Sequence, residues 1–150
     1  MAQNLNQFKQ SVEAGQIALN AIEGRTIEAY IDESYSGTGI VSGSVVTLVS
    51  TSTYPTITVN QKTSGSEVGL GVVAFNIKKT NYKAGDFCEV YVDGKVVYAK
   101  IGAAVNAGAE LTWDNTTGAF IAKTDGNVDA IALDKVAAGT IGRVIVKSIM

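Results

Sequence analysis

The chain has 150 residues, of which 46% are hydrophobic and 17% are charged, and its formal net charge is −2. A chain of this length suits one domain with a sizeable buried core, and its balance of apolar and charged residues excludes a disordered protein. No cluster of Lys and Arg occurs, which argues against nucleic acid as a partner, because nucleic-acid-binding proteins use a basic stripe to release counterions.

The sequence also lacks the features of a membrane or secreted protein. No apolar run approaches the length of a membrane span. The first ten residues, MAQNLNQFKQ, lack the charged start and apolar centre of a signal peptide. We therefore expect no membrane partner and synthesis in a cytoplasm.

Residues 1–24 differ in pattern from the rest of the chain, and we interpret them as an N-terminal arm. The arm carries five apolar residues that are candidate contacts with a partner: Leu5, Phe8, Val12, Ile17 and Leu19. The first three are spaced as on one face of a short helix, and Gly15 interrupts that pattern. The arm is expected to be part helical or extended and to become ordered against a neighbour. A short helix packed on its own domain is the alternative.

Residues 25–150 are predicted to form a single β domain. Sixteen Gly against one Pro, with many Thr, Ser and Val, favour strands and tight turns. Alternating or short apolar runs occur at 26–33, 45–49, 56–61, 68–78, 86–92, 95–101, 110–113, 119–123, 129–133 and 141–149. About ten short strands separated by turns indicate an all-β barrel or sandwich. Little helix is expected outside the arm.

Turn residues divide these runs. Asp93-Gly94 separates two alternating runs, and this dipeptide is the strongest short hairpin signal, so a hairpin is predicted between 86–92 and 95–101. An Ala-Gly turn precedes a strand at Gly85, Gly108 and Gly139.

A second pair of glycines lies inside a run. Gly69 and Gly71 within the strand pattern indicate a bulge or a close backbone approach.

The side chains that usually carry chemistry are scarce. The chain has no His, which removes the commonest general base and the commonest metal ligand, and one Cys, which excludes an internal disulfide. Cys88 shares a strand face with Val90 and Val92 and is interpreted as a small buried apolar residue.

Two acidic stretches are also interpreted as structural. The stretch 125–129 begins like a calcium loop but lacks its Gly and its closing Glu, so it is interpreted as a polar turn. Glu28, Asp32 and Glu33 are interpreted as a solvated face, because two carboxylates four residues apart on one strand lie about 13 Å apart. We expect no catalytic residue, metal or cofactor.

From about Gly69 onward, five segments follow one another in a characteristic order. They are Gly71-Val72-Val73-Ala74, Tyr82-Lys83-Ala84-Gly85-Asp86, the small-residue stretch 103–109 with its second Ala-Gly, the turn Thr117-Gly118-Ala119-Phe120, and Ala138-Gly139-Thr140-Ile141-Gly142-Arg143-Val144. In this order they resemble the tailed-phage head decoration proteins, also called capsid cement or stabilisation proteins. The resemblance covers roughly half of the chain.

The resemblance implies a small β-barrel protein without catalysis, on the exterior of the virion capsid. It implies that the protein braces neighbouring subunits of the major capsid protein and that it associates with itself, often as a trimer. A phage tail or fibre component, or another β-sheet interaction module, is the main alternative. An enzyme is the third, and it would require two acids converging from different strands.

Overall fold

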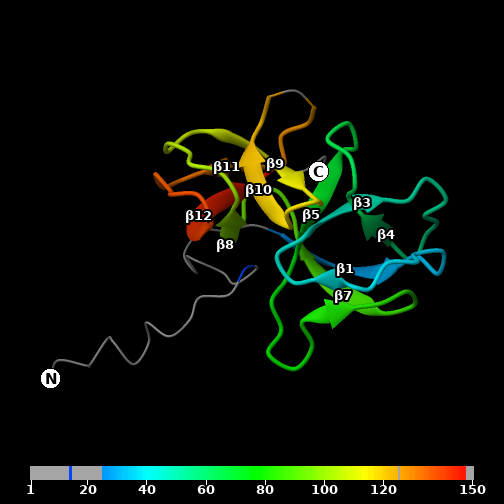
Figure 1. Ribbon diagram of the computed structural model, residues 1–150. Coiled ribbons are helices and arrows are strands. Elements are labelled where there is room, and N and C mark those ends of the chain that lie inside the picture. Colours follow the sequence, from blue (N-terminus) through cyan, green and yellow to red (C-terminus); the bar gives the residue numbers. More distant parts are fainter. Residues whose placement is uncertain (1–13, 15–24, 125, 148–150) are drawn as a thin grey trace, which may run out of the picture.

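The computed structural model describes residue 14, residues 25–124 and residues 126–147 (Figure 1). These residues form twelve strands and no helix, and ten of the strands close into two barrels of five strands each. The prediction of an all-β fold is confirmed. Each of the ten predicted runs overlaps one observed strand, and the two additional strands are a two-residue pair, β2 (Ile40–Val41) and β6 (Asn81–Tyr82). In the described part of the chain, no helix is long and apolar enough to cross a membrane.

The first barrel comes from the N-terminal part of the described chain. Around the barrel its strands are β1 (Thr26–Ile31), β4 (Thr58–Gln61), β3 (Val45–Leu48), β5 (Gly69–Val73) and β7 (Phe87–Tyr91). The β1–β4 pair is parallel and the other pairs are antiparallel. Alternation directs one face of each strand inward, and the core contains Ala29, Ile31, Ile40, Val46, Val59, Leu70, Val73, Tyr82, Cys88, Val90 and Val92.

The second barrel comes from the C-terminal part. Its strands, in order around the barrel, are β10 (Ala119–Ala122), β8 (Val96–Ile101), β12 (Thr140–Val146), β11 (Ala130–Ala132) and β9 (Glu110–Asp114). Here the β10–β8 pair is parallel and the others are antiparallel. In its core the Trp113 and Phe120 rings meet edge to face, with centroids 5.4 Å apart.

The two barrels lie side by side and share a core (Figure 1). Four buried residues of the first barrel, Val45, Val72, Ala74 and Tyr91, belong to the same apolar cluster as the interior of the second barrel. The predicted boundary between an arm at 1–24 and one β domain at 25–150 stays a prediction.

The predicted hairpin around Asp93-Gly94 is wrong. The turn itself is present, since Lys95 N donates to Val92 O at 3.3 Å and Gly94 has φ 92°. However, β7 pairs with β1 and β5 of the first barrel, whereas β8 pairs with β10 and β12 of the second. The turn therefore passes the chain from one barrel to the other. Turn chemistry determines the local backbone, but barrel closure determines which strands become neighbours.

Gly94→Val should lower the free energy of unfolding by about 1–3 kcal/mol, because a β-branched residue is strained at positive φ. Urea unfolding measures the loss. Gly65→Val is the matched control, since a Cβ there would meet no atom within 4 Å and Gly65 has no positive φ. Equal stability of the two variants would contradict the strain expected at this turn.

The prediction for Gly69 and Gly71 is confirmed. The β3–β5 register shifts between Val46, which faces Gly71, and Thr47, which faces Gly69. A Cβ on Gly71 would lie 2.3 Å from the carbonyl oxygen of Tyr91 on β7. The β5 backbone thus approaches β7 too closely for any side chain at this position.

Candidate interaction surface and the buried pair between the barrels

The predicted site residues lie in different places. Leu5, Phe8, Val12, Ile17 and Leu19 lie outside the described residues. Gly85, Gly94, Gly108 and Gly139 adopt φ values of 83°, 92°, 86° and 78°, and Asp93 precedes the second of them. The structure does not bring these glycines together into one site. Instead, each of the three Ala-Gly turns forms a hydrogen bond to the end of a strand. The backbone N–H groups of Gly85, Gly108 and Gly139 donate, respectively, to Ile31 O on β1, Ala132 O on β11 and Ile101 O on β8.

One face of the first barrel carries exposed apolar and acidic side chains together. We call it the β1–β7 face and define it by Glu28, Tyr30, Phe87 and Glu89, which alternation places on the outer side of β1 and β7. Phe87 is 55% exposed although it is aromatic, and its ring centroid lies 5.1 Å from that of Tyr30. The Tyr30 hydroxyl donates to Glu33 at 2.8 Å, and this hydrogen bond raises the pKa of Tyr30.

The two acids of the β1–β7 face stand directly opposite each other. Glu28 is the cross-strand partner of Glu89, and both side chains are exposed. Among the described residues, neither carboxylate takes part in a salt bridge. Like charges directly opposite in a sheet are destabilising. A cationic side chain of a partner would relieve this repulsion.

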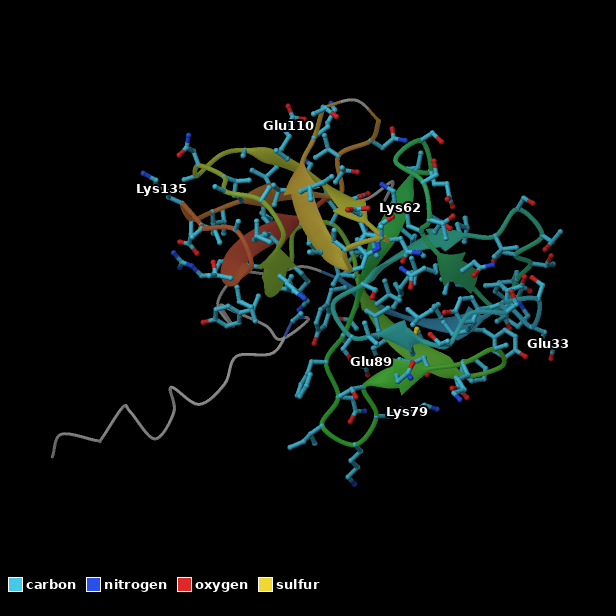
Figure 2. All side chains as sticks on the ribbon, viewed as in Figure 1. Glu33, Lys62, Lys79, Glu89, Glu110 and Lys135 are labelled. Carbon is cyan, nitrogen blue, oxygen red and sulfur yellow. The ribbon has the colours of Figure 1, made fainter. Side chains whose placement is uncertain are left out.

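A shallow pocket of about 210 Å³ adjoins the face. Its lining includes Glu28, Ala74, Phe75, Asn76, Lys79, Tyr82, Phe87, Cys88 and Glu89. Figure 2 shows Glu89 and Lys79 beside β7. Ile77, in the loop between β5 and β6, is 85% exposed. Apolar side chains on both the strand and the loop therefore lie open to solvent around this pocket.

Cys88 lies beneath this face with its thiol buried. Burial raises the pKa of the thiol to about 11, with a smaller contribution from the charge of Asp86. The thiol is therefore protonated at neutral pH and is a poor nucleophile. The interpretation of Cys88 as a buried apolar residue is confirmed.

A buried ion pair between the barrels is the main feature that sequence reasoning missed. Lys62 follows β4 of the first barrel and Asp129 precedes β11 of the second, and their side chains are 0% and 1% exposed. Lys62 Nζ lies 2.5 Å from Asp129 Oδ2. The same oxygen accepts hydrogen bonds from Trp113 N at 2.8 Å and from Thr112 Oγ1 at 3.3 Å. Figure 2 shows Lys62 in the middle of the molecule, where the two barrels meet.

Local sequence patterns do not indicate that Lys62 and Asp129 form a pair. Asp129 stands at the end of a stretch interpreted as a polar turn, and Lys62 stands in no motif, 67 residues earlier. Only the packing of the barrels brings the two side chains together. Among the described residues, no group of three or more His, Cys, Asp or Glu side chains could hold a metal ion.

The described chain is thus a pair of packed β-barrels that carries an exposed face of apolar and acidic side chains and a buried ion pair. The chain belongs to the phage cement protein family, whose profile matches residues 31–148. The resemblance found in the sequence is thereby confirmed. The chain is thus a structural protein of a phage particle.

Among solved structures, the crystal structure of the head fiber gp8.5 N base in bacteriophage phi29 is similar. The TM-score is 0.54 and the identity 12%, over 83% of this chain and 94% of that chain. At this identity the likeness shows a shared fold. No curated protein matches the chain significantly.

Proposed function

We propose that this protein decorates the outside of a phage head and stabilises the head by bracing neighbouring subunits of the major capsid protein. Membership of the phage cement protein family over residues 31–148 carries the proposal. No catalytic step is part of this role. The protein acts by burying surface across a seam between subunits.

The β1–β7 face is the surface that we assign to the capsid. A stable contact buries roughly 800 Å² on each partner, and aromatic side chains at its centre supply much of the binding energy. Phe87 is such an anchor, and Glu28 and Glu89 beside it would pair with a basic side chain of the shell. The apolar residues of the N-terminal arm would add a second contact. Association of the protein as a trimer would multiply weak sites by avidity.

A fibre component is the second candidate function. The similar structure from phage phi29 is that of the base of a head fiber, which favours a role as a support on which a further protein stands. The two roles differ in behaviour: a fibre or tail component would form rings, tubes or elongated assemblies alone, whereas a decoration protein would stay a small oligomer until heads are added.

Co-sedimentation with expanded, undecorated phage heads tests the proposal. We expect saturable binding at a fixed ratio to the major capsid protein. Phe87→Ser should weaken binding by roughly 30-fold, the loss of about 2 kcal/mol that is typical of an interface anchor. Ile141→Ser, at a residue 41% exposed on β12 of the second barrel, is the matched control and should bind like the unaltered chain.

The outcomes separate the parts of the proposal. Absence of binding by the unaltered chain, together with rings or tubes formed by the chain alone, would overturn the decoration role. Unchanged binding by Phe87→Ser would overturn only the assignment of the β1–β7 face.

Deletion of residues 1–22 should leave the β domain folded but abolish decoration of heads, because the candidate partner contacts of the arm are lost. Thermal unfolding checks the fold and co-sedimentation checks the binding. A shortened chain that occupies heads fully would contradict the role of the arm.

A further inference from the structure

Neighbouring side chains and backbone enclose the Lys62–Asp129 pair. Lys62 Nζ donates to Thr112 Oγ1 at 3.3 Å as well as to Asp129 Oδ2. A Cβ added to Gly69 would lie 2.4 Å from Asp129 Oδ1, so the backbone of β5 packs directly against that oxygen. The pair is held at contact distance with almost no exposure to solvent.

When both side chains are ionised, one oxygen of the pair lacks a hydrogen bond. Asp129 Oδ1 is buried and has no hydrogen-bond partner among the described residues, whereas Oδ2 accepts three hydrogen bonds. A carboxylate shares its negative charge between both oxygens, and a buried acceptor without a donor is costly. Burying two charges adds a desolvation cost that their mutual attraction repays only in part.

We propose that Lys62 and Asp129 join in an intramolecular isopeptide bond. Lys62 Nζ attacks Asp129 Cγ, an N–C bond forms, and the bond from Cγ to Oδ1 breaks. The ammonium group loses two protons and keeps one, and the two protons leave with Oδ1 as water. Oxidation state does not change, and no co-reactant is needed.

The product satisfies the groups that the ion pair leaves unsatisfied. Oδ2 becomes an amide oxygen and keeps the hydrogen bonds from Trp113 N and Thr112 Oγ1. If the new amide is cis, so that its N–H and C=O lie on the same side, the remaining N–H of Lys62 can donate to Thr112 Oγ1, as Nζ does now. Oδ1, the oxygen without a partner among the described residues, is the one that departs. Both charges disappear from the core.

The same contacts favour the reaction itself. The attack needs a neutral amine, which proton transfer from Nζ to the contacting carboxylate provides, and in a site shielded from solvent this transfer also removes the cost of burying charge. Negative charge that develops on Oδ2 during attack faces the Trp113 N–H and the Thr112 hydroxyl, the arrangement of an oxyanion hole. Thr112 Oγ1 lies 3.3 Å from both Nζ and Oδ2 and can pass a proton between them.

Mass spectrometry of the denatured full-length chain tests the proposal directly. After folding and incubation at physiological temperature, the chain should be lighter than its sequence by the mass of one water molecule. Trypsin should fail to cleave after Lys62, and a branched peptide should join the segments that contain Lys62 and Asp129.

Two controls make the test specific. The double variant Lys62→Met/Asp129→Leu removes both reacting groups and should show no mass deficit. Within the unaltered chain, the Lys79–Asp86 pair has a similar N–O distance of 2.9 Å but is exposed to solvent, so its two segments should stay unlinked. An unaltered chain that keeps its full mass over several days, with cleavage after Lys62, would overturn the proposal, and this result is independent of binding to heads.

Discussion

Relative to the unaltered chain before the proposed bond has formed, Lys62→Met should lower the free energy of unfolding by about 3–5 kcal/mol, because Asp129 would remain buried without its cation. Met has a similar length and no charge, so the substitution fills the space that Lys62 occupies. Urea unfolding followed by Trp113 fluorescence measures the loss. The variant to compare is Lys79→Met, which breaks the exposed pair with Asp86 and should cost at most about 1 kcal/mol.

A second variant separates charge burial from a loss of packing. Lys62→Met/Asp129→Leu removes both charges and should be more stable than Lys62→Met alone, because no carboxylate is left stranded. If the double variant were no more stable than the single one, the destabilisation would come from lost packing, and a stranded charge would not be its cause.

Phe120→Ala should lower the free energy of unfolding by about 3–5 kcal/mol, the usual cost of a cavity left by a large buried aromatic residue. Phe120 is fully buried on β10, and its ring packs edge to face on Trp113 in the core of the second barrel. Removal of the ring therefore loses both buried area and the aromatic contact. Denaturant unfolding measures the change.

Phe87→Ala is the matched control for Phe120→Ala. The residue type is the same, but Phe87 is half-exposed and contacts Tyr30 at the surface. The expected loss is no more than about 1 kcal/mol. Similar losses in the two variants would show that the second barrel core does not dominate stability.

The fold class could be predicted because alternation is a local signal. Each of the ten predicted runs overlaps a strand, since a buried inner face and a solvated outer face leave a period of two in the sequence. The pair β2 and β6 was missed because two residues are too short to show a period. The close approach at Gly71 was predictable, because a glycine weakens the interior of a strand and often marks a position where another backbone comes close.

What the sequence did not reveal depends on contacts between distant residues. The hairpin at Asp93-Gly94 was predicted wrongly because a turn dipeptide does not specify which strands close a barrel. Lys62 and Asp129 meet only after both barrels have packed. The β1–β7 face was also not predicted, since Glu28 and Phe87 become neighbours through the pairing of β1 with β7. The family could be recognised because the resemblance rests on the order of five segments along this chain, which is a property of the sequence alone.

Each barrel is built from one uninterrupted stretch of chain, with all strands of the first barrel ending at Tyr91 and all strands of the second beginning at Val96. During synthesis on the ribosome, all five strands of the first barrel are therefore made before any strand of the second. Domains generally fold in the order in which they emerge. Until the strands of the second barrel have been synthesised, no second barrel covers Val45, Val72, Ala74 and Tyr91. The nascent chain therefore passes through a stage in which the first barrel is closed but these four apolar residues are exposed. At this stage chaperone binding and aggregation would compete with completion of the fold.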